Sequence, residues 1–78
     1  MPITQETVNL AAAVKGAVEY GVKNDDELYA LVERLNQALE TRNEKALLEL
    51  ARKIRDHAAG LYGPVVSAAD DLVVHLGG

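Results

Sequence analysis

The sequence predicts an all-α fold, a compact antiparallel bundle of three to four short helices. Apolar residues recur at spacings of three and four along almost the whole chain, as on one face of a helix. Capping residues, Gly and Pro divide this pattern into short segments. The one strand-like run, Leu72–Leu76, has no partner strand elsewhere, and an isolated strand is not stable. Seventy-eight residues suffice for one small domain, so we assign residues 1–78 to a single helical domain.

The first predicted helix runs from Gln5 to Tyr20. Thr4 precedes it as an N-cap, because its hydroxyl accepts a backbone N–H of the first turn. Its apolar stripe consists of Leu10, Val14, Ala17 and Gly21, flanked by Ala13 and Val18. Lys15 and Glu19 fall opposite this stripe, and Gly21 is expected to end the helix.

The second predicted helix runs from Asp25 to Thr41 after a cap at Asn24, and the third runs from Glu44 to Ala59. The second stripe consists of Leu28, Leu31, Val32, Leu35 and Leu39, and the third of Leu47, Leu50, Ala51, Ile54, Ala58 and Leu61. Either Thr41 or Asn43 serves as the cap of the third helix. A single long helix from Asp25 to Ala59 is the rival interpretation, because Arg42 and Lys45 are good helix formers.

The fourth predicted helix begins at Pro64, which suits a first helical turn because it has no N–H to leave unpaired. It ends near His75 and is apolar on nearly every side. This exceeds what one packing face needs, so we expect the surplus to lie at the centre of the bundle or against another chain. Tyrosines at the edges of a stripe are also favoured anchors in protein interfaces. The predicted partner-binding residues are Tyr29, Tyr62, Val66, Val73 and Val74.

The composition disfavours several classes of function. The net charge is −4, whereas a nucleic-acid-binding domain usually carries net positive charge. The absence of Cys removes thiolate metal sites, disulfides and Cys nucleophiles. The opening residues, Met1–Glu6, have neither a basic nor an apolar signal region, and no apolar run reaches the length of a membrane span. We therefore expect a cytoplasmic protein that has no membrane contact.

The residues that could support chemistry are few. His57, Asp71 and His75 are the one conceivable metal set, but nothing completes it, and Asp71 with His75 reads more simply as a surface pair. Ser67 has no His and Asp in an order that suggests a catalytic triad. No Gly-rich phosphate-binding loop is present. We expect no enzymatic activity, no cofactor and no metal.

The sequence thus favours a non-enzymatic protein–protein interaction module: an adaptor, an inhibitor or an assembly factor. We expect it to act through the apolar surface of the C-terminal helix, as a homodimer or bound to a larger protein. The alternative is a small nucleic-acid-associated regulator that uses the basic face of the third helix. That face comprises Lys45, Arg52, Lys53 and Arg55, with Glu49 and Asp56 among them.

Overall fold

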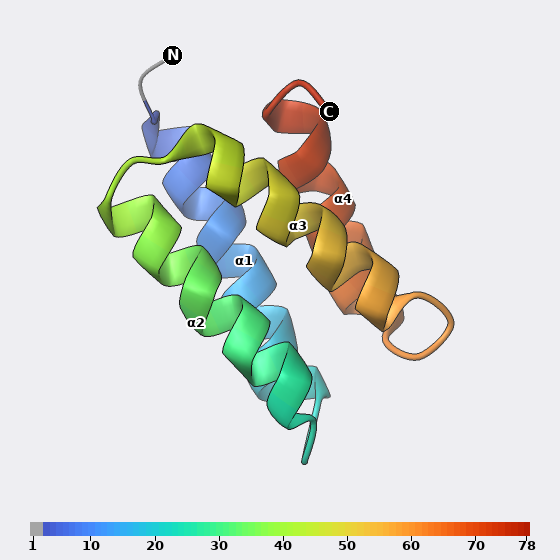
Figure 1. Cartoon of the computed structure of the whole chain (residues 1–78). Coiled ribbons are helices and arrows are strands. Elements are labelled where there is room, and N and C mark those ends of the chain that lie inside the picture. Colours follow the sequence, from blue (N-terminus) through green and yellow to red (C-terminus); the bar gives the residue numbers. More distant parts are fainter. Residues whose placement is uncertain (1–2) are drawn as a thin grey trace.

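A computed structural model describes residues 3–78, so Met1 and Pro2 of the opening segment lie outside the described residues. Four helices follow one another: α1 (Gln5–Gly21), α2 (Asp26–Glu40), α3 (Glu44–Ala58) and α4 (Gly63–His75). Successive helices run antiparallel, and α4 returns to pack on α1 (Figure 1). Each helix therefore has two neighbours in a closed ring. The predicted all-α antiparallel bundle is confirmed, with four helices and no strand among residues 3–78.

The core along the axis of this ring is entirely aliphatic. Its buried hydrophobic side chains are Ala11, Val14, Val18, Val22, Leu28, Val32, Leu35, Ala38, Leu47, Ala51, Ile54, Ala58, Val65, Ala69, Leu72 and Val73. The radius of gyration of 11.1 Å matches the value of about 11–12 Å expected for a folded domain of this length. Within the described chain, no helix combines the length and the apolar character needed to cross a bilayer.

Side-chain caps define where the first three helices begin. The Thr4 hydroxyl accepts the N–H of Thr7, as the sequence predicts, and the Asn43 side chain accepts the N–H of Ala46. The predicted cap at Asn24 is wrong, because the carboxylate of Asp25 accepts the N–H of Leu28 instead. Asn24 adopts a left-handed conformation (φ 61°) and turns the chain between α1 and α2. Such a conformation is commoner for Asn than for most residues with a side chain.

The end of α1 lies slightly beyond the expected position. Gly21 is the last helical residue, and Val22, in an extended conformation, follows as the C-cap. Val22 is 1% exposed, so its side chain packs into the core directly after the end of α1.

The turn between α2 and α3 excludes the single long helix. Arg42 has a left-handed backbone (φ 56°), its N–H donates to the carbonyl of Leu39, and the N–H of Asn43 donates to the carbonyl of Ala38. These two bonds are those of a Schellman motif, which ends a helix by pairing its last carbonyls. The chain then reverses, and Asn43 rather than Thr41 caps α3.

Helix α4 lies between α1 and α3 and buries most of its apolar surface against them. Val73 is 1% exposed, so it belongs to the core, and its predicted place on a partner-binding surface is wrong. The sequence could not distinguish Val73 from its neighbour, because both flank the same stripe. Val74 is 68% exposed, and Val66 is half-buried.

Paired substitutions on α4 test this orientation. Val73→Glu should lower the free energy of unfolding by more than about 3 kcal/mol, because it places an unpaired carboxylate in the core. Val74→Glu should change it by less than about 0.5 kcal/mol, because that site faces solvent. Urea unfolding followed by circular dichroism measures both, and equal losses would contradict the assigned orientation.

Candidate functional site

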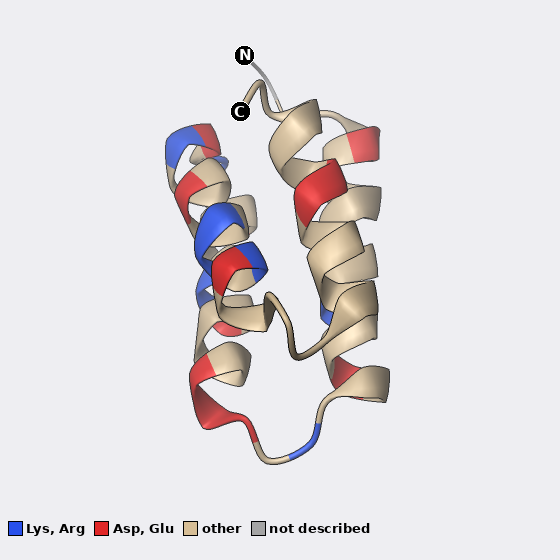
Figure 2. Cartoon of the chain, turned by 90° about the vertical axis from the view of Figure 1, so that its right-hand side faces the viewer, with Lys and Arg blue, Asp and Glu red and all other residues tan. Residues whose placement is uncertain are grey.

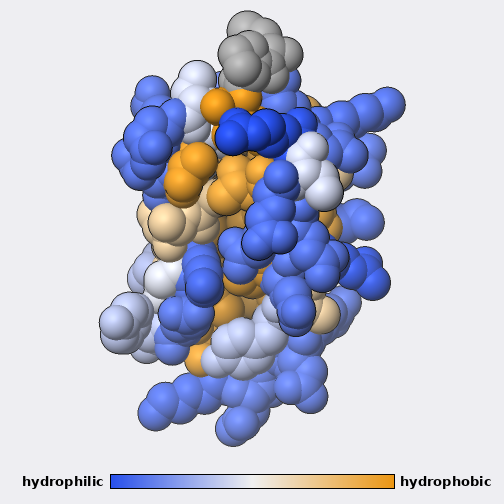
Figure 3. Space-filling model, turned by 90° about the vertical axis from the view of Figure 1, so that its left-hand side faces the viewer, coloured by the Kyte–Doolittle hydropathy of each residue, from blue (hydrophilic) through white to orange (hydrophobic). Residues whose placement is uncertain are grey.

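A groove lies between α1 and α2, the pair of neighbouring helices that pack least extensively. The groove has a volume of about 380 Å³, at the lower end of the range for ligand pockets. Figure 3 shows apolar surface along the middle of the face formed by these helices, between polar side chains. The residues that line this α1–α2 groove are Lys15, Val18, Glu19, Tyr29, Val32, Glu33 and Asn36.

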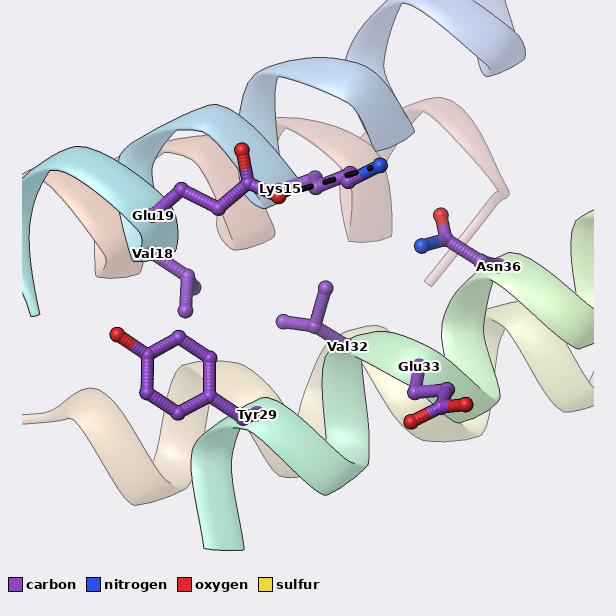
Figure 4. A pocket seen from close by; sticks show the side chains of 7 residues that line it. All are labelled: Lys15, Val18, Glu19, Tyr29, Val32, Glu33 and Asn36. Carbon is purple, nitrogen blue, oxygen red and sulfur yellow. Dashed lines mark ion pairs between the residues drawn. The ribbon is translucent and has the colours of Figure 1, made fainter. Parts of the chain in front are cut away.

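The groove has an apolar floor and a charged rim. Val18 and the ring of Tyr29 point toward each other at one end, and Val32 projects toward α1 (Figure 4). On the rim, the Lys15 ammonium lies 3.9 Å from the Glu19 carboxylate, and both side chains are about half exposed. Lys15 and Glu19, which the sequence placed opposite the stripe, thus border the apolar floor.

The groove is open because of the side chains that α1 directs at α2. Lys15 and Glu19 follow at a helical spacing on this side of α1, and both line the groove. Ionic side chains extend to water rather than fill the gap between the helices. Val18 and Val32 lie beneath the groove and are themselves buried.

A polar cluster of Asp25, His57 and Tyr62, called here the Asp25 cluster, closes one end of the bundle. Both carboxylate oxygens of Asp25 lie within hydrogen-bond distance of His57 Nε2, at 3.0 and 3.1 Å. The Tyr62 hydroxyl donates to the same carboxylate at 3.1 Å. Asp25 also caps α2, so one side chain joins the α1–α2 turn, the end of α3 and the α3–α4 turn.

These hydrogen bonds shift the pKa of both Asp25 and Tyr62. The hydrogen bond from His57 lowers the pKa of Asp25 below its ordinary value of 3.8, and the N–H of Leu28 lowers it further. The hydrogen bond from Tyr62 acts in the same direction, while partial burial opposes all three. The same Asp25 carboxylate raises the pKa of the Tyr62 hydroxyl, because it holds that proton in place. The cluster therefore favours a charged Asp25 and a neutral Tyr62.

A second polar cluster, formed by Thr4, Thr7 and His75, joins α4 to the start of α1. His75 Nε2 lies 2.8 Å from the Thr7 hydroxyl, and His75 Nδ1 lies 4.0 Å from a Glu6 oxygen. The order carboxylate, imidazole, hydroxyl is that of a hydrolase triad. Thr7, however, is only 2% exposed and also bonds to Thr4, so a substrate carbonyl has no approach to its hydroxyl. The cluster holds two helices together.

The metal set weighed from the sequence does not assemble. His57 contacts Asp25, the N-cap of α2, and His75 contacts the first turn of α1. Because α1 and α2 are antiparallel, these contacts lie at opposite ends of the bundle (Figure 1). Asp71 is exposed on α4. Among residues 3–78, no three acidic, His or Cys side chains are grouped to hold a metal ion.

The two predicted partner-binding tyrosines have separate positions. The Tyr29 hydroxyl donates to the carbonyl of Val22 at 2.6 Å, which sets the ring as one wall of the α1–α2 groove. Tyr62 is half-buried in the Asp25 cluster. Tyr29 therefore lines the α1–α2 groove, whereas the Tyr62 hydroxyl is hydrogen-bonded to Asp25 at the end of the bundle.

The predicted basic face of α3 is a mixed surface. Lys45, Arg52 and Lys53 are exposed, and Glu49 and Asp56 are exposed on the same helix. Arg55 instead turns to α4, where its guanidinium lies 3.3 Å from Asp70. Figure 2 shows blue and red alternating on α3, whereas α4 carries acidic residues alone. No continuous basic stripe results along α3.

The residues that the sequence did not single out are those brought together by helix pairing. Val18, Val32, Glu33 and Asn36 come from two helices, and their meeting depends on how far apart those helices lie. Asn36 stands next to the second stripe, and its half-burial in the groove is not indicated by the sequence pattern. The contact between Asp25 and His57 joins residues 32 positions apart and has no local signal.

Comparisons of this chain with protein-family models, with curated proteins and with solved structures give no match. The function is therefore inferred from the geometry of these sites.

Substitutions in the Asp25 cluster test its role in stability. Asp25→Ala should lower the Tm by about 4–8 °C or more, because it removes a helix cap together with the acceptor for His57 and Tyr62. Asp25→Asn keeps the capping oxygen and should lose less. Tyr62→Phe should have the smallest effect, because it removes one donor only. Equal Tm values for Asp25→Asn and Asp25→Ala would contradict a contribution of the helix cap to stability beyond that of the contacts with His57 and Tyr62.

The lowered pKa of Asp25 predicts an acid-dependent loss of stability. Because the folded-state pKa lies below that of the unfolded chain, the stabilisation is fully present above pH 3.8 and is lost as pH falls through the folded value. Urea unfolding of the wild type and of Asp25→Asn over about pH 5 to 2 measures this. The two stability curves should converge toward the acid limit, and a constant difference would contradict the contribution of the charged carboxylate.

Proposed function

We propose that this chain is a non-enzymatic protein–protein interaction module that holds a segment of a larger protein in the α1–α2 groove. One observation supports this proposal: the ring of helices is more extensively packed at three of its seams, and the fourth leaves a groove of about 380 Å³ above the buried Val18 and Val32. Tyr29, a residue type favoured at interface anchors, forms one wall of that groove.

The surface of α4 supports such a role less well. Val74 is the one large apolar side chain that α4 exposes extensively, and Asp70 and Asp71 precede it by four and three residues. An isolated exposed Val beside two carboxylates is ordinary protein surface. We therefore transfer the proposed interaction from α4 to the α1–α2 groove.

Within this proposal the roles of adaptor, inhibitor and assembly factor remain equivalent, because each needs only a docked partner. The cytoplasmic location remains a prediction from the sequence. The homodimer becomes an outcome of the experiment below, since a second copy is one of the chains that a docking surface can capture.

Site-specific photo-cross-linking in extracts of the source cells tests the proposal. The cross-linking residue replaces Glu33 at the groove, Val74 on α4 or Glu49 on α3, and each of these side chains is exposed. Position 33 should give one defined adduct identified by mass spectrometry. Position 49, the matched control, should give only background.

The pattern of adducts distinguishes the surfaces. An adduct with a different protein at position 33 supports the proposal, and an adduct with a second copy there would replace the larger partner by a homodimer. A defined adduct at position 74 alone would return the interaction to α4. Background at position 33 with an intact fold would overturn the role of the α1–α2 groove.

A further inference from the structure

We propose that two copies of this chain pair through the side of α1 that points away from the core, with the two α1 helices antiparallel about a two-fold axis. The residues of this α1 outer face are Gln5, Asn9, Ala12, Ala13, Gly16 and Tyr20. At about 100° per residue they occupy one side of the helix, opposite its buried residues. The face is separate from the α1–α2 groove, so its test does not depend on what that groove binds.

The α1 outer face carries no charge, unlike the outer faces of the other three helices in the described chain. Their exposed carboxylates are Asp26, Glu27, Glu33 and Glu40 on α2, Glu49 and Asp56 on α3, and Asp70 and Asp71 on α4. The solvated face of a surface helix is usually charged or polar, whereas the centre of a protein interface is depleted of charge and enriched in Tyr. The composition of the α1 outer face is therefore that of an interface.

Tyr20 lies at one end of this face and takes no part in the packing of a single chain. Its side chain is 93% exposed, more than any other large hydrophobic residue among residues 3–78. The hydroxyls of Tyr29 and Tyr62 donate to groups within the chain, but that of Tyr20 has no such partner among the described residues. The Tyr20 ring is therefore available to another molecule.

Gly16 lies inside α1, and the single chain does not require a glycine at this position. Its backbone is helical, and a Cβ atom built on it meets no other atom within 4 Å. Glycine inside a helix is less stable than alanine, so the missing side chain is unfavourable for an isolated chain. The approach of a second helix explains it, because the distance between packed helices is set by the side chains at their contact.

The charges of this chain favour a second copy as the occupant of the face. The net charge is −4, and pairing through α2 or α4 would bring carboxylates of the two copies together. Pairing through α1 does not, because its outer face has none. The carboxylates beside the face have partners within the chain: Glu19 lies 3.9 Å from Lys15, and Glu6 lies 4.0 Å from His75.

The positions on the face also suit a two-fold axis. They are symmetric about the midpoint between the two alanines, and a two-fold interface uses the same patch of both copies. Asn9 and Gly16 lie about 5 Å on either side of this midpoint, so each Asn9 of an antiparallel pair meets Gly16 of the second copy. Gln5 and Tyr20 lie about 11 Å from it and meet at both ends. The amide of Asn9 thus occupies the space that Gly16 leaves open.

The proposed contact is small. From Gln5 to Tyr20 it is about 22 Å long and one helix wide, which is less than the roughly 800 Å² per partner of a standard interface. We therefore expect a weak, reversible dimer whose population rises with protein concentration.

Sedimentation equilibrium of the full chain, at concentrations up to about 1 mM, tests the proposal. The wild type should show a monomer–dimer equilibrium. Gly16→Glu should weaken it by about tenfold or more, because it places two carboxylates in the contact. Gln37→Glu, the matched control, adds the same charge at an exposed site on α2 and should weaken it by less than about twofold. Circular dichroism should show that both variants keep the wild-type helix content, since a side chain at position 16 has room.

Cysteine substitutions test the orientation of the two helices, because the chain contains no Cys of its own. Under mild oxidation, Ala13→Cys should form a disulfide-linked dimer about tenfold faster than Ser67→Cys, an exposed control on α4. Asn9→Cys and Gly16→Cys should each link poorly alone and efficiently when mixed. In an antiparallel pair like positions lie about 10 Å apart, and a disulfide spans less than about 7 Å between Cα atoms.

Three results would overturn the proposal. One is a monomer at every concentration. Another is a dimer that Gly16→Glu and Gln37→Glu weaken equally, since its contact would then lie outside α1. The third is efficient linking of Gly16→Cys to itself without a mixed link to Asn9→Cys, which would exclude the antiparallel arrangement.

Discussion

The structure depends on burying four apolar helical stripes, because helices in proteins draw most of their stability from the packing of an apolar face. The closed ring gives each stripe two neighbouring helices to pack against. This constraint explains why α4, the most apolar helix, does not leave a wide exposed surface: it lies between α1 and α3, and Val73 enters the core. The same ring leaves one weak seam, where Lys15 and Glu19 of α1 border the groove to α2.

Polar side chains complete the two ends of the bundle, where helix termini leave backbone groups unpaired. At one end Asp25 caps α2 and also accepts hydrogen bonds from His57 and Tyr62. At the other end His75 bonds to the buried hydroxyl of Thr7. Within residues 3–78, every buried side-chain nitrogen or oxygen has a hydrogen-bond partner. Both histidines thus join helix ends, which accounts for them without a metal or a catalytic role.

The weak seam between α1 and α2 is the basis of the functional proposal. The α1–α2 groove combines the half-exposed ring of Tyr29 with the charged rim of Lys15, Glu19 and Glu33. The mixed charges of α3 and the acidic neighbours of Val74 do not offer this combination.

The pattern of residues specifies the four helices almost completely, because periodicity and capping act within a few neighbouring positions. Thr4, Asn43 and Pro64 were recognisable for this reason, and the one misplaced cap lies a single residue from the true one. The groove and the Asp25 cluster required the folded chain. Val73 and Val74 both flank the apolar stripe of α4, so the sequence pattern does not show which of them is buried. Only the packing of one helix against two others decides which flank is buried, because the distance between helices is a property of all the side chains between them.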